Sequence, residues 1–293
     1  MKLADLLRDV PVVSVSGSTD VEVTGVTADS RLVRKGSVFV AIPGTKQDGS
    51  KYIPQAVQKG AAAVVVSAQG PRSKVQGPEV VVDDPRAALA LLAANFYGRP
   101  AESMSLVGVT GTSGKTTTTK MIESIFDATG EPVGLIGTIE YRAGEERLVA
   151  DRTTPDAVVL QEWFAKMRDA GVRHAVMEVS SHALALKRTH GLHFHAAVFT
   201  NLSRDHFDFH KDFDDYFAAK RILFEQIDGS RKTAVVNIDD TYGRRLATDL
   251  GKAAMSFGQS AEADIHPAPG FEISVRGLRG TVATPAGDLK IES

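Results

Sequence analysis

The stretch "VGVTGTSGKTTTTK", residues 107–120, decides the fold of much of this chain. A short apolar run ends in glycines, a lysine and consecutive threonines, the order expected where a buried strand turns sharply into a helix. Glycines let the backbone approach a phosphate closely, and the free N–H groups at the start of a helix favour bound anions. The stretch therefore predicts a strand, a phosphate-binding loop and a helix.

Nucleotide binding is assigned to this loop. Lys115 would neutralise charge on the outer phosphates, and the Thr116 hydroxyl could bind Mg²⁺. The strict G-x-x-x-x-G-K-[ST] pattern is not met, because position 109 is valine and the glycines fall as G-x-x-G-x-x-G-K-T. An ordinary glycine-rich turn is the alternative, which the flanking strand and helix and the Lys-Thr pair disfavour. The predicted cofactor-binding residues of the loop are Gly111, Thr112, Ser113, Gly114, Lys115, Thr116 and Thr117.

Outward from the loop, apolar strands alternate with amphipathic helices. Strands are predicted over 105–110, 132–139, 174–180, 194–202 and 233–239, and helices over 114–130, 156–171 and 213–227. Such alternation is typical of an open, mostly parallel sheet with helices on both faces, and ligands of these sheets bind at the carboxyl ends of the strands. We therefore predict an α/β central domain over residues 99–293.

The first part of the chain has a different pattern, with short strands and few helices. One helix is predicted over 84–98, with Asp84 as its N-cap and Pro85 at its first position. The segment "RPAES" that follows is interpreted as a linker. We predict a small N-terminal α/β domain over residues 1–98, followed by a boundary near 99–104.

The composition is that of a soluble globular protein, with 43% hydrophobic and 24% charged residues. At 293 residues the chain is long enough for two domains. The formal net charge of -2 gives no general reason to expect nucleic acid or an anionic membrane as partner. Without cysteine there is no disulfide or thiolate metal site. No signal peptide or apolar run long enough to span a bilayer is recognised, so a cytoplasmic monomer is expected.

Polar side chains also follow the other predicted strands. Glu178 ends an apolar strand, where a carboxylate could bind a hard cation, although a lone glutamate there is usually a solvated turn residue. His206 and His210 have the i,i+4 spacing that could hold zinc on one helix face, but the lack of cysteine and of an HExxH pattern argues against a zinc enzyme. Lys220 lies on an amphipathic helix between aromatic residues, which by itself indicates a surface lysine with a packed stem.

Six segments, taken together and in order, resemble the Mur ligases of bacterial cell-wall synthesis. They are "GVTGTSGKTT", "RTTPD", "MEVSSHALAL", "FTNLSRDHFDFH", "YFAAKRILF" and "VVNIDD". "EVSSHAL" separates the branch that adds the third amino acid from its sister ligases and from folylpolyglutamate synthase. "TADSRLVRKGSVFVAIPG" and "DGSKYIPQAVQKGA" resemble the uridine-nucleotide domain of that branch. The resemblance runs from about residue 20 to the end of the chain.

The resemblance implies amide ligation driven by ATP and Mg²⁺. The D-glutamate carboxylate of UDP-MurNAc-L-Ala-D-Glu would attack the γ-phosphate of ATP, and a diamino acid, meso-diaminopimelate or L-lysine, would then displace phosphate. Thr116 and Glu178 would bind magnesium, and His206 would be a ligand at a second metal site. Lys220 would be carbamylated and face a metal, which reverses its interpretation as a surface lysine. The implied catalytic residues are Lys115, Glu178, His206 and Lys220.

The resemblance also implies a set of substrate-binding residues. Those at the uridine diphosphate sugar would be Ala28, Ser30, Thr45, Lys46 and Gln47, and those at the peptide end Arg152, Thr153, Thr154, Ser180 and Arg188. Arg188 would pair with a carboxylate, and Asn237 would lie near the adenine. Two positions depart from the family pattern: Arg152 stands where asparagine often precedes Thr-Thr, and Leu186 where glutamine can stand.

The length of the chain is a larger departure. Mur ligases have a third, C-terminal domain that selects the incoming amino acid, and we expect it to be absent here, so that the chain alone would bind both substrates but form little product. Two other classes of function are considered. One is a catalytically incomplete nucleotide-sugar and ATP-binding fragment, and the other is a P-loop kinase or GTPase, which would leave "EVSSHAL" unused and lacks an NKxD motif. Another Mur-type or folylpolyglutamate-synthase-type ligase is a further alternative.

Overall fold

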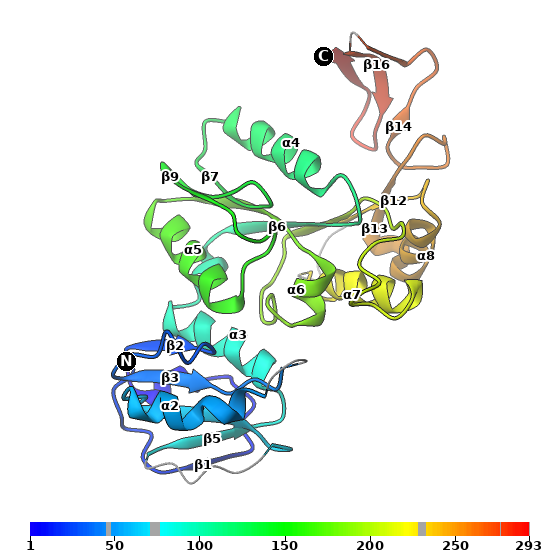
Figure 1. The fold of residues 1–293 in the computed structure, drawn as a ribbon. Helices are drawn as coiled ribbons and strands as arrows, with labels where there is room; N and C mark the ends of the chain where they lie inside the picture. Colours follow the sequence, from blue (N-terminus) through cyan, green and yellow to red (C-terminus); the bar gives the residue numbers. More distant parts are fainter. Residues whose placement is uncertain (45–47, 71–76, 228–232, 276, 293) are drawn as a thin grey trace. The chain divides into compact units, whose positions relative to one another are not determined.

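The computed structural model describes residues 1–44, 48–70, 77–227, 233–275 and 277–292. The chain separates by contacts into two compact units, each with its own sheet and helices (Figure 1). The first unit comprises Met1–Met104, Pro155–Gly171 and Ala185–Leu192, and the second Ser105–Thr154, Val172–Leu184 and His193–Ser293. The predicted substrate residues Thr45, Lys46 and Gln47 lie outside the described residues.

The first unit contains a five-stranded sheet in the order β1-β5-β4-β3-β2. Its strands are β1 (Ser14–Ser16), β2 (Gly25–Thr27), β3 (Ser37–Val40), β4 (Ala63–Ser67) and β5 (Glu79–Val82). All pairs are parallel except β1 with β5. Its helical elements are α1 (Leu3–Leu6), η1 (Gly49–Tyr52), α2 (Ile53–Gln58), α3 (Pro85–Phe96), η2 (Pro100–Ser103) and α5 (Ala157–Asp169).

Alternating side chains of these strands form two apolar clusters. Val38 and Val65 belong to the cluster that contains residues of α1 and α3, whereas Phe39 and Val64 belong to the one that contains residues of α2. This division follows from the two-residue period of a strand, which sends successive side chains to opposite faces. As predicted, Asp84 caps α3, where its carboxylate accepts hydrogen bonds from two main-chain N–H groups.

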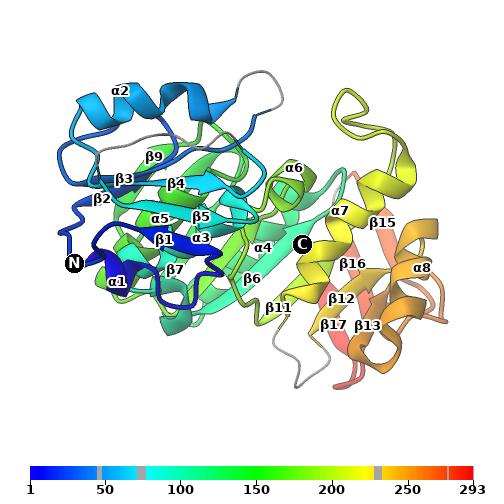
Figure 2. The same cartoon turned by 90° about the horizontal axis from the view of Figure 1, so that it is seen from below.

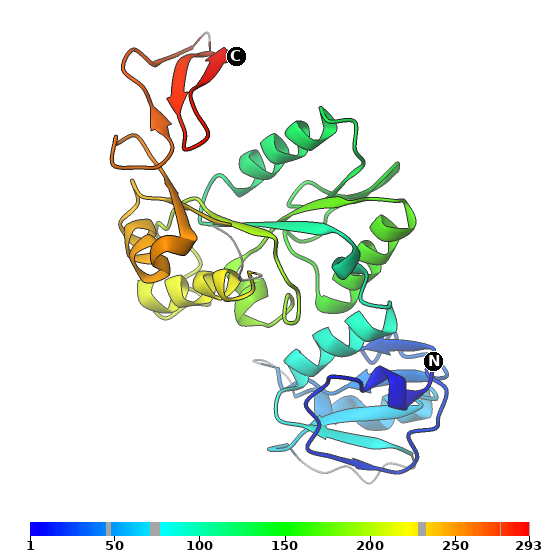
Figure 3. The ribbon, with the colours of Figure 1, turned by 180° about the vertical axis from the view of Figure 1, so that it is seen from behind.

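The second unit contains an eight-stranded sheet in the order β13-β12-β11-β6-β10-β7-β8-β9. Its parallel strands are β6 (Ser105–Thr110), β7 (Val133–Ile136), β10 (His174–Glu178), β11 (Ala196–Phe199), β12 (Ala234–Asn237) and β13 (Ala254–Phe257). Its helical elements are α4 (Lys115–Asp127), α6 (Ser181–Ala185), α7 (Phe213–Glu225), α8 (Thr241–Leu250) and η3 (Gly251–Ala253). Helix α4 covers one face of the sheet, and α7 and α8 cover the other (Figures 1 and 3).

Six further strands are antiparallel. The hairpin of β8 (Glu140–Ala143) and β9 (Glu146–Val149) extends the central sheet beside β7, and the sequence pattern did not predict it. Near the C-terminal end, β16 (Gly277–Ala283) pairs with β14 (His266–Pro267), β15 (Glu272–Ser274) and β17 (Leu289–Glu292); three of these are labelled in Figure 2.

The predicted α/β fold, with a mostly parallel central sheet flanked by helices, is confirmed. By contacts, α5 groups with the first hundred residues, because it packs against α3 and η2. The assignment of 1–98 and 99–293 as functional domains stays a prediction. Among the described residues, no helix combines the length and apolar character needed to cross a membrane.

Candidate functional site

The glycine-rich loop connects the end of β6 to the start of α4. Gly111 has a φ of 152° and Gly114 a φ of 83°, values that glycine adopts without strain. A Cβ atom on Gly111 would lie 1.9 Å from the Thr200 hydroxyl oxygen, so a side chain at this position would clash. The loop therefore depends on glycine both for its backbone conformation and for its close contact with the segment after β11.

That neighbouring segment holds the loop by hydrogen bonds. The N–H of Thr112 donates to the Asn201 carbonyl oxygen (2.9 Å), and the N–H of Ser113 donates to Asn201 Oδ1 (3.0 Å). The Thr200 hydroxyl donates to the Ser113 carbonyl oxygen (2.7 Å). Asn201 lies near the end of the predicted strand 194–202, and its role at the loop was not predicted, since only the parallel pairing of β11 with β6 brings the two segments together.

Lys115 folds back onto the loop. Its ammonium donates to the carbonyl oxygens of Gly111 (3.0 Å) and Thr112 (2.9 Å). Burial lowers the pKa of Lys115, and the charges of Glu178 and Asp205 act in the opposite direction. The ammonium and the N-terminal end of α4 thus lie at one loop, an arrangement that suits a polyanion.

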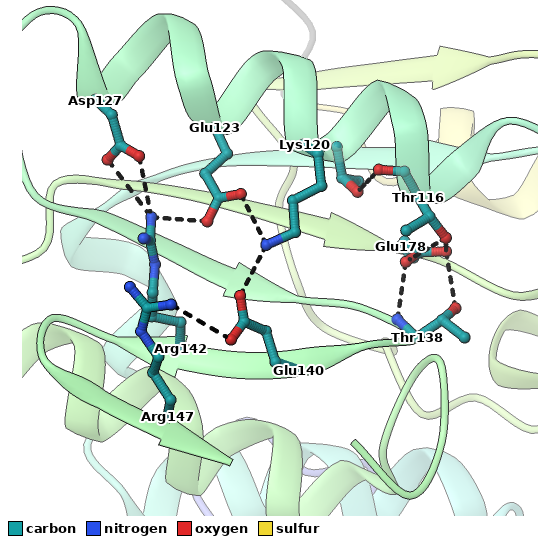
Figure 4. A network of polar contacts seen from close by, with 10 residues as sticks. Thr116, Lys120, Glu123, Asp127, Thr138, Glu140, Arg142, Arg147 and Glu178 are labelled. Atoms are coloured by element: carbon teal, nitrogen blue, oxygen red, sulfur yellow. Dashed lines mark hydrogen bonds and ion pairs between the residues drawn. The ribbon is translucent and has the colours of Figure 1, made fainter. Parts of the chain in front are cut away.

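Glu178, at the end of β10, is only 1% exposed. Its carboxylate is held by uncharged donors (Figure 4): the Thr116 hydroxyl lies 3.0 Å from each oxygen, the N–H of Thr138 donates to Oε1 (2.8 Å), and the Thr138 hydroxyl donates to Oε2 (3.0 Å). Thr138 was not predicted as a site residue. The structure thus joins Glu178 to the first turn of α4, next to the loop.

The carboxylate oxygens of Glu178 and the hydroxyl oxygen of Thr116 suit a magnesium ion. A carboxylate and a threonine hydroxyl are hard oxygen ligands, and Mg²⁺ is usually bound by one or two carboxylates together with waters and substrate phosphates. No group of three or more His, Cys, Asp or Glu side chains suited to a metal occurs in the described part of the chain. The side chains present therefore suit a cation that is shared with a phosphate ligand better than one held by the protein alone.

Lys220 is buried, which corrects its interpretation as a surface lysine. It is 1% exposed, its ammonium donates to the Gly111 carbonyl oxygen (2.7 Å), and it lies 4.4 Å from the centre of the Tyr216 ring. Burial, with a further contribution from Lys115, lowers the pKa of Lys220 well below its ordinary value. The amine is therefore more readily neutral than that of an exposed lysine.

His206 and His210 do not share a helix face, so that expectation is wrong. The segment before α7 is not helical, and His206 has a φ of 56°. The His206 side chain is 41% exposed, and its ring packs edge-on against His182 with the ring centres 4.9 Å apart. His210 is only 2% exposed; its Nε2 lies 2.9 Å from the Ser181 hydroxyl and its Nδ1 3.2 Å from Asp215 Oδ2.

Three residues predicted at the peptide end lie close to Glu178. The Thr154 hydroxyl donates to the Glu178 carbonyl oxygen (2.8 Å) and accepts from the N–H of Ser180 (3.1 Å). The Thr153 hydroxyl lies 3.0 Å from that of Thr138. In the same segment, the Arg152 carbonyl oxygen accepts a hydrogen bond from the Tyr141 hydroxyl (2.5 Å). Arg188, in contrast, belongs to the first unit.

The remaining predicted residues have structural partners. In the first unit, the Ser30 hydroxyl donates to Gln55 Oε1 (2.8 Å), and Ala28 is half-buried. In the second unit, Asn237 Nδ2 donates to the Thr200 carbonyl oxygen (2.8 Å). Asn237 therefore connects β12 to the segment that contacts the glycine-rich loop.

Two family models match the chain. The model of the Mur ligase middle domain matches residues 109–293, and the model described as Mur ligase family, catalytic domain, matches residues 22–97. A curated relative from Geobacter metallireducens, UDP-N-acetylmuramoyl-L-alanyl-D-glutamate--2,6-diaminopimelate ligase, is 42% identical over 100% of this chain and 58% of its own length. The protein of the same name from Bacillus velezensis is 41% identical over 99% of this chain and 60% of its own.

Solved structures give the same fold. A structure of a UDP-N-acetylmuramoyl-L-alanyl-D-glutamate--2,6-diaminopimelate ligase superposes with a TM-score of 0.82 at 24% identity, covering 100% of this chain and 59% of that one. MurF from Acinetobacter baumannii gives a TM-score of 0.59 at 21% identity, covering 92% and 55%. The chain thus spans little more than half the length of the relatives that it matches.

Proposed function

Because the chain belongs to the Mur ligase family, we propose that it acts in the ATP-dependent addition of a diamino acid to UDP-MurNAc-L-Ala-D-Glu. The names of the curated relatives make 2,6-diaminopimelate the proposed diamino acid. The contact of the Thr116 hydroxyl with the Glu178 carboxylate, beside a closed phosphate-binding loop, is the observation that carries the proposal. We propose that these oxygen atoms bind Mg²⁺ beside the outer phosphates of ATP.

The proposed chemistry has two steps. An oxygen of the D-glutamate carboxylate attacks the γ-phosphorus of ATP, and ADP leaves. The amine of the diamino acid then attacks the acyl carbon, and phosphate leaves as the amide forms. Phosphoryl transfer is catalysed mainly by positioning and charge neutralisation. Lys115 and the loop would hold the phosphates, and Thr116 and Glu178 would hold Mg²⁺, which supplies further neutralising charge.

A second cation would lie at His206 and a carbamylated Lys220. Carbamate formation requires a neutral amine, which the lowered pKa of Lys220 favours. Lys220 and His206 both contact the Tyr216 ring, with ring centres 6.1 Å apart for the histidine and the tyrosine. The carbamate would replace the positive charge of this lysine by a metal-facing carboxylate.

The other ligand contacts are proposed from matching positions. Ala28 and Ser30, with Thr45, Lys46 and Gln47, would bind the uridine diphosphate sugar. Arg152, Thr153, Thr154, Ser180 and Arg188 would bind the peptide end, and Asn237 would lie near the adenine. A cytoplasmic monomer without nucleic-acid or membrane partners remains the proposed state of the protein.

Ligand discrimination tests the proposal. By titration calorimetry, the chain should bind UDP-MurNAc-L-Ala-D-Glu more tightly than UDP-MurNAc-L-Ala, because the proposed peptide contacts need the D-glutamate carboxylates. It should also bind ADP more tightly with Mg²⁺ than with EDTA. Equal affinity for the two nucleotide sugars would contradict the proposed substrate, and ADP binding without any effect of Mg²⁺ would contradict the roles of Thr116 and Glu178.

A further inference from the structure

Thr138 lies in the turn between β7 and β8 and donates two hydrogen bonds to the Glu178 carboxylate. Its main-chain N–H donates to one carboxylate oxygen (2.8 Å) and its hydroxyl to the other (3.0 Å), so a single residue holds both oxygens. We infer that Thr138 is a positioning residue, which fixes the Glu178 carboxylate for a divalent cation and links it to Thr153. The inference rests on the proposed function and assigns a residue that the function did not use.

The hydrogen bonds from Thr138 stabilise the charged form of this carboxylate. It is buried, so water cannot replace a lost donor, and an unsatisfied buried charge is costly. The other donor, Thr116, lies 3.0 Å from both oxygens and does not distinguish them, whereas Thr138 places a separate donor on each. When a cation binds the Thr116 oxygen, the hydrogen bonds from Thr138 would still fix the position of the Glu178 carboxylate. Partners behind a metal ligand commonly set its orientation and affinity.

Gly137 supplies independent support. A Cβ atom at this position would lie 2.8 Å from Glu178 Oε1, closer than side-chain carbon atoms approach other groups. The backbone of the turn is therefore packed directly against the carboxylate. Its shape is closed by a hydrogen bond from the N–H of Gly137 to the Glu140 carbonyl oxygen (3.1 Å).

The turn is also anchored to the helix that carries Thr116. Lys120 pairs with Glu140 (2.7 Å) on β8, and Glu123, about one turn further along the helix, pairs with Arg142 (2.7 Å) (Figure 4). Thr116, Lys120 and Glu123 are spaced i, i+4 and i+7, so they lie on one face of α4. These ion pairs fix the position of β8 along α4, and therefore the position of Thr138 relative to Thr116.

The direction of the hydrogen bonds links Thr138 to the peptide end. A hydroxyl has one hydrogen, and a carboxylate is a stronger acceptor than another hydroxyl. The Thr138 hydroxyl lies 3.0 Å from both Glu178 Oε2 and the Thr153 hydroxyl oxygen, and its one hydrogen can be donated to either of them. A peptide group that occupies the Thr153 oxygen would leave this hydrogen to Glu178, so peptide and cation should affect each other's affinity, and linkage makes this effect reciprocal.

Electron paramagnetic resonance measurements of Mn²⁺ binding to the chain in the presence of ADP test this role of Thr138. Thr138→Val keeps the shape and the main-chain N–H but removes the hydroxyl, and should weaken Mn²⁺ binding by about 10-fold or more. Thr138→Ser restores the hydroxyl and should stay within about threefold of wild type. Thr248→Val, an exposed threonine of α8 that bonds only its own helix, is the matched control and should have no effect. ADP affinity in EDTA should be unchanged in all three.

The outcomes separate the inference from the proposed function. If wild type binds no Mn²⁺ with ADP, the proposed function falls, and the inference with it. If wild type binds Mn²⁺ and folded Thr138→Val binds it equally well, the inference alone is wrong. Should Thr138→Val fail to fold, Thr153→Val decides: UDP-MurNAc-L-Ala-D-Glu should change Mn²⁺ affinity in wild type and Thr138→Ser but not in Thr153→Val. The absence of that effect in wild type overturns the link.

Discussion

Lys115 and Lys220 share one acceptor, the carbonyl oxygen of Gly111. Burial lowers the pKa of both side chains, and the charge of Lys115 lowers that of Lys220 further. Two buried amines at one oxygen favour either an anion beside them or the loss of one positive charge. A bound triphosphate and a carbamate on Lys220 would relieve this arrangement in those two ways, which connects the electrostatics of the loop to the proposed reaction.

Lys115→Ala should weaken ATP binding by about 10- to 100-fold, the loss expected from about 1.5–3 kcal/mol of charge-assisted hydrogen bonding. Stability should change little, because the ammonium bonds only to loop carbonyls. Calorimetric titration with ATP measures the first effect and urea unfolding the second. Lys252→Ala, at an exposed residue of η3, is the control. Unchanged affinity in Lys115→Ala would mean that the phosphates bind elsewhere.

At the residue scale, sequence reasoning works best where the signal is local. The glycine-rich turn between a strand and a helix was predicted because its residues are consecutive, and the phosphate-binding role of Lys115 stays a prediction. Lys220 was misjudged from its own helix, because its burial depends on Gly111, which is distant in sequence. The contact of Thr138 with Glu178 was missed for the same reason, because the two residues are distant in sequence.

At the scale of elements, helix α4 and strand β8 are joined by ion pairs that are largely shielded from water. Glu123 is 5% exposed and pairs with Arg142 at 2.7 Å. Removing Glu123 takes one partner from Arg142, which keeps Asp127 at 3.4 Å. Glu123→Ala should therefore lower the free energy of urea unfolding by about 1–3 kcal/mol. Glu145→Ala, at an exposed residue of the turn before β9, should cost less than about 0.5 kcal/mol. Equal losses in the two variants would show that the ion pair does not matter.

His210 joins α6 to α7, since its ring lies between Ser181 and Asp215. Burial lowers the pKa of His210, while Asp215 acts against this and Lys220 and His206 act with it. As pH falls below about 6.5, the unfolded chain takes up a proton that the folded state resists, so the protein should lose stability. His210→Gln should reduce this loss by at most about 1.4 kcal/mol per pH unit.

Urea unfolding at several pH values between 5 and 7.5 measures the effect of His210→Gln. His193→Gln, at an exposed histidine, is the control. If His210→Gln and wild type lose stability in parallel as the pH falls, the buried ring is not a source of the acid sensitivity.

Elements were predicted well where periodicity is strong and poorly where it is short. The strands β6 and β10 and the helices α4 and α7 follow from apolar runs and helical spacing. The β8–β9 hairpin was missed because its strands, EYRA and ERLV, contain charged residues in place of an apolar run, and β9 is exposed along its whole length. The segment before α7 was considered as a helix from the spacing of two histidines, yet the left-handed backbone at His206 excludes a helix there.

In the whole molecule, each compact unit carries its own proposed ligand chemistry. Ser30, in the first unit, is proposed to contact the uridine diphosphate sugar, whereas the loop of the second unit is proposed to bind ATP. Ser30→Ala should therefore weaken UDP binding by about 5- to 10-fold, the value of one hydrogen bond, and leave ATP affinity unchanged. Both affinities are measured by calorimetry on the same preparation. Equal loss of the two ligands would indicate misfolding or a wrong site.

The central claim is that these residues bring the D-glutamate carboxylate to the γ-phosphate of ATP. Trapping the acyl phosphate tests it most directly. The chain is incubated with ATP, Mg²⁺, UDP-MurNAc-L-Ala-D-Glu and hydroxylamine, and the hydroxamate is detected by mass spectrometry together with ADP. We predict hydroxamate with the dipeptide substrate, none with UDP-MurNAc-L-Ala, and none from Lys115→Ala. Absence of hydroxamate from wild-type protein that binds both ATP and the dipeptide substrate would contradict the account.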